Sequence, residues 1–393
     1  MQNTVTTNTS LPLLNFAINT KSFLYHLSFA HSVLQKKSLI NVSNQVQIKA
    51  RDNQITLFAL DNDLHLTQTF SAKILQEGAF VAPAAILLDI VRKIGHDEVV
   101  IEQISDTQLK LCAPRCEFNL VINPQSIAPA TDSLDWQFEI KLSVAELLVL
   151  IDSTAFAICS DESRLNISGL CVIQEDEYLK AVSSDGHRLA FAQIWTNANT
   201  ATSANSIIPR RTVFELTKIL KDQKNNAGLV RISCNESRIE FEYNKIILRS
   251  RLVHAQFPNY KNFLPSGLDK TLTIDTHQFI KVIERIAVIN LGQFKSIKLQ
   301  FLEDRMCVSS FQDGAGNAKE EVLYNKTEQE EVYCEVNFSS QWNIGFNPKY
   351  LIEALQTIRT TKTVISLHDE YRPIKIQPEN NDNIFSIIMP VRI

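Results

Sequence analysis

Three segments of this 393-residue chain repeat one hydrophobic pattern, and this repeat constrains the fold more than any other feature. In each copy an entering hydrophobe is followed by apolar residues at i, i+1 and i+4, which form one stripe of an amphipathic helix. The copies are Ile18 with Phe23, Leu24 and Leu27; Leu142 with Leu147, Leu148 and Ile151; and Ile274 with Phe279, Ile280 and Ile283. The nearly equal spacing predicts three similar units.

A second pattern recurs in step with the first. Its copies are Pro83 with Leu88, Asp89 and Ile90; Pro209 with Phe214, Glu215 and Leu216; and Asn347 with Ile352, Glu353 and Ala354. Proline is tolerated where a helix starts because its missing N–H had no partner there, and Asn can cap the same position. Each third of the chain is therefore predicted to contain two helices.

Between the helices lie alternating apolar and polar segments joined by short polar turns. They cover residues 46–50 and 55–59 around Asp52-Asn53, 232–234 and 239–243 around Asn235-Glu236, and 297–301 and 306–308 around Glu303-Asp304. Such alternation is typical of antiparallel hairpins with one solvated face. The predicted fold class is α+β, with three repeated domains that each pack two helices on antiparallel sheet. The expected boundaries are a flexible tail at 1–13 and domains at 14–134, 135–262 and 263–393.

Net charge, the length of apolar runs and the cysteine content limit which binding partners and which cellular compartment we expect. The net charge of -4 rules out a uniformly basic nucleic-acid coat, although it permits a local basic face. The chain has no apolar run long enough to span a bilayer, so we expect a soluble, cytoplasmic protein with no membrane partner. The seven cysteines form no Cys-x-x-Cys pair, and we expect them to be reduced and mostly buried.

Two motifs invite a catalytic or nucleotide-binding interpretation. Ser183, Ser184, Asp185 and His187 crowd together, but catalytic triads are built from separated segments, and Asp185-Gly186 is explained by a turn. Gly314 and Gly316 resemble the start of a phosphate loop, yet the third glycine position is occupied by Lys319. The histidines and acidic residues match no metal motif. We therefore expect no catalytic residue, no cofactor and no metal.

Basic residues flank five of the six predicted helices. They are Lys21, Lys36 and Lys37; Arg92 and Lys93; Arg210, Arg211, Lys218 and Lys221; Lys281 and Arg285; and Lys349, Arg359 and Lys362. A solvated helix face is one interpretation. The other is a positive inner surface that attracts phosphates without reading sequence, which requires the helices to face one side.

Four ordered segments resemble one known family. Ser183 to Ala190, Ile208 to Leu216, Phe257 to Pro265 and the terminus Ile388 to Ile393 resemble motifs of the bacterial DNA polymerase III beta subunit, the DNA sliding clamp. The likeness runs from about Leu14 to Ile393. It implies a head-to-tail homodimeric ring, with helices lining a hole and sheets outside. Such a ring encircles duplex DNA without sequence preference and tethers the replicative polymerase catalytic subunit, the clamp loader and other replication and repair proteins.

The resemblance also implies particular sites. A pocket between the second and third domains receives short apolar partner motifs, and its wall is expected to include Ile167, Ser184, Gly186, His187, Arg188, Leu189, Pro258, Asn262, Phe263, Phe338, Pro373, Ile387, Ile388, Met389, Pro390, Val391 and Arg392. The ring junction is expected at Phe118, Leu120, Val288 and Ile289. DNA contact is expected at Lys36, Lys37 and Arg164.

The prediction is a non-enzymatic processivity factor, and two alternatives stay open at this point. One is a hydrolase or nucleotide-binding enzyme that uses the Ser183 to His187 cluster. The other is a β-rich peptide-binding scaffold without DNA encirclement, because peptide capture does not require a ring.

Overall fold

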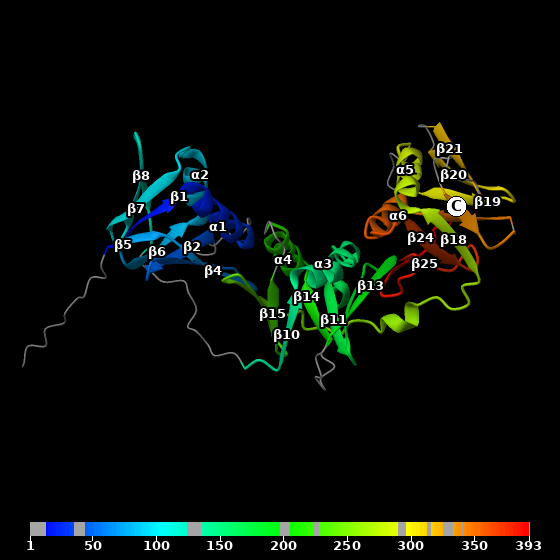
Figure 1. Ribbon diagram of the computed structural model, residues 1–393, viewed down its shortest axis with the longest axis horizontal. Helices are drawn as coiled ribbons and strands as arrows, with labels where there is room; N and C mark the ends of the chain where they lie inside the picture. Colours follow the sequence, from blue (N-terminus) through cyan, green and yellow to red (C-terminus); the bar gives the residue numbers. More distant parts are fainter. Residues whose placement is uncertain are drawn as a thin grey trace, which may run out of the picture. The chain divides into compact units, whose positions relative to one another are not determined.

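The computed structural model describes residues 13–34, 44–123, 135–196, 205–222, 228–289, 296–312, 316–324, 333–339 and 341–392. Contacts divide the chain into two compact units. The first contains Met1–Val144 and Glu215–Arg251, and the second contains Ala145–Phe214 and Leu252–Ile393. Figure 1 shows the elements of both units in chain order, from blue to red.

The first repeat contains two helices, α1 (Thr20–Val33) and α2 (Ala84–Lys93). Its strands are β1 (Asn15–Asn19), β2 (Gln45–Arg51), β3 (Gln54–Leu60), β4 (Leu64–Ser71), β5 (Lys73–Gln76), β6 (Gly78–Pro83), β7 (Glu98–Ser105), β8 (Gln108–Ala113) and β9 (Cys116–Val121). The predicted hairpin around Asp52-Asn53 is the pair β2 and β3, and both turn residues have positive φ.

The second repeat contains α3 (Val144–Asp152) and α4 (Arg210–Asp222), with short 3-10 helices η2 (Ala155–Ala157), η3 (Leu165–Ile167) and η4 (Tyr260–Phe263). Its strands are β10 (Phe138–Ser143), β11 (Gly169–Glu175), β12 (Tyr178–Ser184), β13 (Arg188–Trp195), β14 (Asn205–Pro209), β15 (Leu229–Cys234), β16 (Arg238–Tyr243) and β17 (Ile246–Arg251). The predicted hairpin around Asn235-Glu236 is β15 with β16.

The third repeat contains α5 (Thr276–Ala287) and α6 (Pro348–Leu355). Its strands are β18 (Lys270–Asp275), β19 (Ile297–Phe301), β20 (Arg305–Gln312), β21 (Gly316–Leu323), β22 (Cys334–Val336), β23 (Trp342–Phe346), β24 (Lys362–Leu367), β25 (Ile374–Pro378) and β26 (Ile384–Ile388). The predicted hairpin around Glu303-Asp304 is β19 with β20.

All six predicted helices form, two in each repeat, within the described residues. Side-chain caps explain where several of them begin. Asn19 Oδ1 accepts a hydrogen bond from the Ser22 N–H at 3.1 Å, and Asp275 Oδ1 accepts from the Gln278 N–H at 2.8 Å. Asn347 caps α6 in the same way and Pro348 takes its first turn, as the second sequence pattern predicts for a helix start.

The strands form four antiparallel sheets in the described part of the chain. Their orders are β5-β1-β7-β8-β9; β10-β15-β16-β17-β4-β3-β2-β6; β14-β11-β12-β13-β26-β25-β24-β18-β22; and β21-β20-β19-β23. Two sheets run across a repeat boundary. Within the first unit β17 pairs with β4, and within the second unit β13 pairs with β26. The α+β class and the three repeats are therefore confirmed.

Apolar side chains fill the space between helices and sheets. Phe23 and Phe279, at equivalent positions of α1 and α5, are fully buried. Five of the seven cysteines are buried and all seven are free, in line with the prediction. Burial raises the thiol pKa of Cys171 and of Cys334 to about 12, so both stay protonated near neutral pH.

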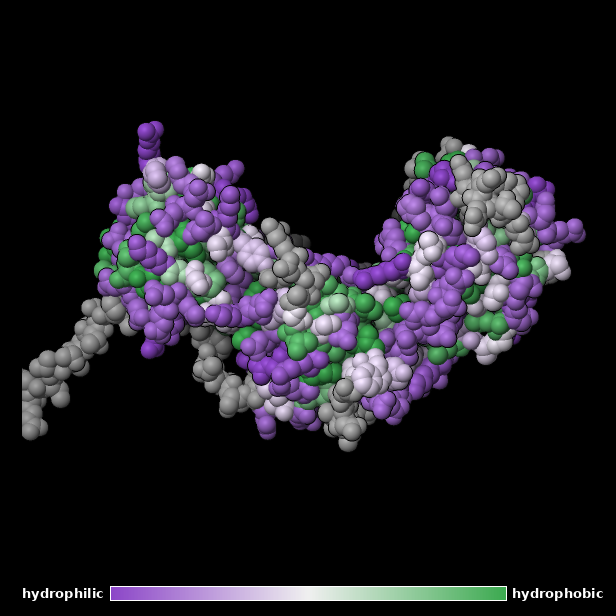
Figure 2. Space-filling model, in the orientation of Figure 1, coloured by the Kyte–Doolittle hydropathy of each residue, from purple (hydrophilic) through white to green (hydrophobic). Residues whose placement is uncertain are grey.

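The outer surface is mixed in character. Figure 2 shows hydrophilic residues over most of the visible face, with hydrophobic residues in small groups between them. Among the described residues no helix is both long and apolar enough to cross a bilayer.

Candidate functional site

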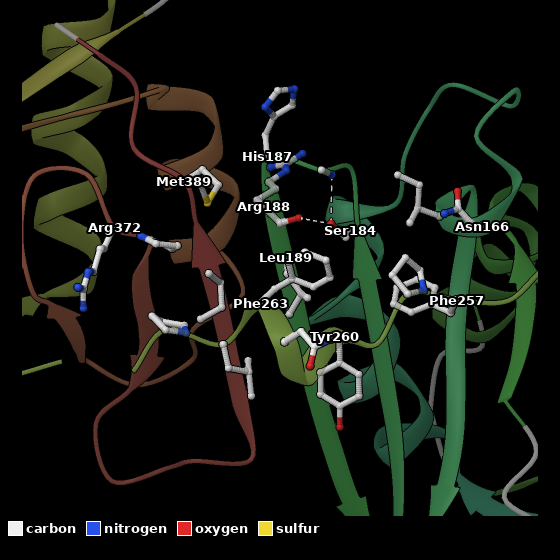
Figure 3. Close-up of a pocket in the computed structure, with 18 of the residues that line it drawn as sticks. Asn166, Ser184, His187, Arg188, Leu189, Phe257, Tyr260, Phe263, Arg372 and Met389 are labelled. Atoms are coloured by element: carbon white, nitrogen blue, oxygen red, sulfur yellow. Dashed lines mark hydrogen bonds between the residues drawn. The ribbon is translucent and has the colours of Figure 1, made fainter. Parts of the chain in front are cut away.

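A cavity of about 650 Å³ opens in the second unit, where the second and third repeats share a sheet. Four segments line it: η3, the turn between β12 and β13, the segment 257–266 that contains η4, and the end of β26 with the loop before β25. Figure 3 shows Leu189 on β13, Met389 just after β26 and Phe263 of the segment 257–266 around this cavity.

The floor of the cavity is apolar. Leu189, Phe257 and Ile387 are nearly fully buried and belong to one hydrophobic cluster. At the rim, Phe263 and Met389 remain 58% and 44% exposed, although both are large apolar side chains. A concave apolar site with a few polar groups at its edge is the usual form of a ligand pocket.

Hydrogen bonds within the turn fix its shape. Asp185 Oδ1 accepts from the N–H groups of His187 at 2.9 Å and Arg188 at 3.1 Å, and Ser184 Oγ accepts from the Gly186 N–H at 3.1 Å. Gly186 has φ +91, and a Cβ there would lie 2.8 Å from Nη2 of Arg164. The turn therefore needs glycine, and Asp185-Gly186 is a turn as the sequence predicts.

Arg188 joins this turn to α6 of the third repeat. Its Nε donates to Asp185 Oδ2 at 3.0 Å, and its Nη2 donates to the carbonyl oxygen of Phe156 at 2.8 Å. Its Nη1 is hydrogen-bonded to Glu353, and its guanidinium lies 4.4 Å from the ring centroid of Tyr350. The side chain is 7% exposed. Arg188 thus holds the turn in place, and its charge is satisfied inside the protein.

The C-terminal residues continue past β26 as a second wall. The Met389 N–H donates to the carbonyl oxygen of His187 at 3.0 Å, and the Val391 N–H donates to that of Gly345 at 2.9 Å. These two bonds attach the segment after Ile388 both to the β12–β13 turn and to β23. The segment carries Met389, which is one of the residues that line the cavity.

An ion-pair triad holds the segment 257–266 against β11. Glu175 accepts from Lys180 Nζ and, at 2.9 Å, from Lys261 Nζ on η4. These two donors lower the pKa of Glu175 to about 2. The carboxylate therefore stays charged throughout the physiological pH range, so both ion pairs are present there.

The structure brings twelve of the seventeen predicted pocket residues to this one cavity. They are Ile167, Ser184, Gly186, His187, Arg188, Leu189, Pro258, Asn262, Phe263, Pro373, Ile387 and Met389. The other five lie elsewhere. Phe338 packs on Phe301, Ile388 is fully buried in the core of the third repeat, and a separate cavity is lined by Pro390, Val391 and Arg392.

Sequence reasoning missed eight residues that line the cavity. They are Arg164, Asn166, Phe257, Tyr260, Leu264, Pro265, Ser266 and Arg372. Arg164, which the resemblance expects to contact DNA, also lines this cavity, and its Nη1 donates to the Asp185 carbonyl oxygen at 2.8 Å. Phe257, Leu264 and Pro265 belong to a segment that the resemblance had already identified, so the signal for them was present in the sequence.

Of the four residues expected at a ring junction, two lie on β9 in the first unit and two directly follow α5 in the second unit. Phe118 and Leu120 are on β9, the last strand of its sheet; Phe118 is half-buried and Leu120 is buried. Val288 is the C-cap residue that follows α5 and is 72% exposed, and Ile289 after it is half-buried. The apolar residues Val121 on β9 and Phe311 on β20 are also exposed.

Basic side chains lie on the helix surfaces, many beside an acid. Lys218 Nζ is 2.6 Å from Glu215 Oε1, and Arg92 Nη1 is 2.8 Å from Asp89 Oδ1. A shallow cavity in the first unit is lined by residues of α1 and α4, including Lys21, Lys218 and Lys221. Lys36 and Lys37 lie outside the described residues.

The Ser183 to His187 cluster does not converge on one point. Ser183 is fully buried and its Oγ donates to the carbonyl oxygen of Thr154, whereas His187 is exposed and stacks at 6.2 Å from Tyr350. A nucleophile and its base must lie within hydrogen-bond reach of each other, and these two side chains have other partners. The geometry therefore gives no support to the hydrolase alternative.

Family models match all three repeats of the chain. Residues 14–132, 141–259 and 261–392 match the N-terminal, central and C-terminal domains of the DNA polymerase III beta subunit. Beta sliding clamps of Rickettsia felis and Caulobacter vibrioides are 31% and 27% identical, each aligned over 97% of this chain and 100% of its own length.

Solved structures agree with the family models. The sliding clamp of Bartonella birtlesii bound to griselimycin is 27% identical with a TM-score of 0.89, and the beta subunit of Pseudomonas aeruginosa is 25% identical with a TM-score of 0.86. These alignments cover 97% and 96% of this chain and 100% of each solved chain. The chain therefore belongs to the family of the DNA polymerase III beta subunit, the bacterial DNA sliding clamps.

Proposed function

We propose that two copies of this chain join head to tail into a ring that encircles duplex DNA and acts as a non-enzymatic processivity factor. The proposal takes the three clamp domains as 14–134, 135–262 and 263–393, after a tail at 1–13. Its main support is a relationship between strand edges. At both repeat boundaries inside the chain, the last strand of the first half of one repeat pairs with the last strand of the second half of the next repeat. Within the described residues one strand of each kind, β21 and β9, is left at the end of its sheet, and these two could form a third pair of the same type.

The strand pairs follow one rule. β4, β13 and β21 each end the first half of a repeat, and β9, β17 and β26 each end the second half. At the first boundary β4 of the first repeat pairs with β17 of the second, and at the next boundary β13 of the second pairs with β26 of the third. The same rule pairs β21 of the third repeat with β9 of a first repeat. In the described residues both strands end their sheets.

A head-to-tail contact of this kind generates a ring when the rotation closes, and two copies seal both junctions with the same pair of surfaces. Covering the exposed backbone of two edge strands also removes a site for uncontrolled aggregation. Ring closure therefore satisfies hydrogen-bonding groups that a single copy leaves at its sheet edges.

Acidic residues on the helices at the repeat boundaries make contacts across those boundaries. At the first boundary Ser32 on α1 donates to Glu215 Oε2 on α4 at 2.6 Å. At the second boundary the equivalent acid, Glu353 on α6, binds Arg188. Asp89 on α2 occupies the same position of the repeated pattern as Glu215 and Glu353. We therefore place α2 of one copy near Val288 of the other, where the 72% exposed valine would be covered.

DNA contact in this proposal is weak and independent of sequence. Salt screens the attraction between DNA phosphates and lysine or arginine side chains, so each contact is weak. A ring that is closed around the duplex needs no tight contact to remain on it. Pairing of Lys218 with Glu215 moderates the local positive charge. We retain Lys36, Lys37 and Arg164 as proposed DNA contacts, and add Lys21 and Lys221 because they line one surface with Lys218.

We propose the 650 Å³ cavity as the site for short apolar motifs of the replicative polymerase catalytic subunit, the clamp loader and other clamp-binding repair proteins. The apolar floor and the exposed Phe263 and Met389 support this, because burial of such side chains favours binding. A related clamp, from Bartonella birtlesii, was solved bound to griselimycin. The cytoplasm, which holds the bacterial chromosome, is the proposed compartment.

Sedimentation and particle images test this proposal together. The chain of 44.5 kDa should sediment as a dimer, and class averages should show a central opening wide enough for a duplex. A compact monomer without an opening would contradict it and would favour the peptide-binding scaffold without encirclement.

A further inference from the structure

We propose a defined register for the junction between subunits, in which Glu117 on β9 faces Lys319 on β21 of the partner. This inference rests on the proposed ring. It adds which residues meet, which charges they carry and why this junction differs from the two inside the chain.

The first step is the equivalence of β4, β13 and β21. All three strands have eight residues, and they begin at Leu64, Arg188 and Gly316. Each is the second strand of a hairpin, and its last residue pairs with the first residue of the preceding strand: Gln54 with Ser71, Tyr178 with Trp195, and Arg305 with Leu323. The three strands therefore align from end to end without a gap.

The second step is the equivalence of β17, β26 and β9. They begin at Ile246, Ile384 and Cys116, and each follows the strand with which it forms a hairpin. Their antiparallel partners across the repeat boundaries give the register. Ile246 pairs with Gln68, and Ile384 pairs with Ala192. In both cases the first residue of the second strand faces the fifth residue of the first strand.

Carrying this register to the free edges places Cys116 opposite Glu320 of the partner. Antiparallel pairing then sets Glu117 against Lys319 and Phe118 against Ala318. The equivalent of the last pair inside the chain is Leu248 with Leu66, both buried. Phe118 and Ala318 are half-buried in one chain, so pairing would cover two apolar side chains on the core side of the sheet.

The charges on the outer side fit the same register. Glu117 and Lys319 are both exposed and of opposite sign. Lys110 Nζ lies 2.9 Å from Glu117, and Lys319 Nζ lies 2.8 Å from Glu321. Pairing therefore brings Lys110 and Glu117 of one copy beside Lys319 and Glu321 of the other copy. Charges of opposite sign then alternate across the junction. A two-residue slip in one direction would instead place Glu117 opposite Glu321, and like charges directly opposite are unfavourable.

The equivalent outer position is uncharged at both internal boundaries. It holds Thr67 with Ile247 at one and Phe191 with Phe385 at the other, where the two rings stack at 4.6 Å. An exposed ion pair is screened by salt, whereas a stacked apolar pair is not. The charged pair therefore specifies register and partner at the junction that must open to admit closed circular DNA, and it leaves that junction the most salt-sensitive of the three.

Charge exchange tests the pair directly. Glu117→Lys and Lys319→Glu should each raise the dimer dissociation constant about tenfold at low salt, since two junctions then carry like charges. The double variant should return to within about twofold of the unmodified chain. Glu236→Lys, on the β15–β16 turn, is the matched control and should leave the constant unchanged. Additive losses in the double variant would contradict the pairing.

A disulfide tests the register independently of charge. Directly opposite residues have Cα atoms within disulfide range, and diagonal neighbours do not. Under mild oxidation Glu320→Cys should link to the native Cys116 of the partner and give a covalent dimer. Ala318→Cys should not, and adding Cys116→Ser to Glu320→Cys should abolish the link.

The outcomes separate the two proposals. If the unmodified chain is a monomer, the proposed ring fails. If it is a dimer but Ala318→Cys links to Cys116 and Glu320→Cys does not, the ring stands and the register is wrong.

Discussion

The backbone N–H of Met389 donates a hydrogen bond to the carbonyl oxygen of His187 at 3.0 Å, which joins the C-terminal segment to the β12–β13 turn. The two residues come from different repeats of one compact unit. The bond closes one side of the 650 Å³ cavity with backbone atoms, and the Met389 side chain stays 44% exposed at the rim. A flexible thioether at the edge of an apolar site can adapt to different peptides.

Removal of the C-terminal segment should therefore abolish peptide binding. A chain that ends at Ile388 loses Met389 and its bond to His187, but it keeps β26, β9 and β21 complete. Affinity for a short apolar partner peptide, measured by fluorescence anisotropy, should fall at least about tenfold. The dimer should persist in sedimentation. Unchanged peptide affinity would reject this cavity as the partner site.

Arg188 should contribute to stability out of proportion to its exposure. Replacing it with Ala leaves Asp185 and Glu353 without their shared cation, and breaking such a buried pair costs about 3 kcal/mol in free energy of unfolding. Arg188→Lys should recover only part of this, because an ammonium cannot reproduce the donor geometry. Urea unfolding measures both. As a control, Lys349→Ala removes only a 3.9 Å contact to Glu353 and should have little effect.

Ile289→Asp should open or split the dimer. The substitution places an unpaired charge beside Val288, at an edge that the ring would cover with apolar contacts. Sedimentation velocity should show monomers at concentrations where the unmodified chain is dimeric. Leu229→Asp changes an apolar residue that is 62% exposed and lies on β15, away from both free edges, and it should remain a dimer. An intact Ile289→Asp dimer would show that the junction is misplaced.

Stability should fall on acidification through His65. Burial, together with the nearby positive charges of Arg238, Arg249 and Arg251, lowers the pKa of His65 from 6.5 to about 4, and Asp63 opposes this only in part. Between these two values the unfolded chain binds a proton that the folded chain does not, so the free energy of unfolding rises with pH from about 4 to 6.5. His65→Gln should flatten this slope in urea unfolding at pH 7.5 and pH 5. Equal slopes in both proteins would contradict the assignment.

Local sequence patterns predicted the helices and hairpins because periodicity and capping act over a few residues. Asn347 and Pro348 illustrate this, since a cap and a first-turn proline specify a helix start without any distant contact. The pairing of β17 with β4 joins segments far apart in the chain, and no local pattern encodes it. The repeat predicted three similar units, but the structure was needed to show that β9 and β21 end their sheets within the described residues.

The candidate site shows the same division. The turn at Asp185-Gly186 could be predicted from its residues, but the direction of Arg188 could not, because Glu353 and Tyr350 come from another repeat. Pro390 and Val391 follow Met389 directly, yet they line a different cavity, since the bond from Val391 to Gly345 turns the chain away. A resemblance transfers residues by position, and side-chain direction needs the structure.

Retention on DNA of different topology tests the central claim most directly. The chain, assembled on closed circular duplex by its clamp loader, is passed through a sizing column at moderate salt before and after one restriction cut. Encirclement predicts that the protein stays with the circle and leaves once the DNA is linear, because it slides off the ends. Equal retention on circular and linear DNA, or none on either, would contradict the account.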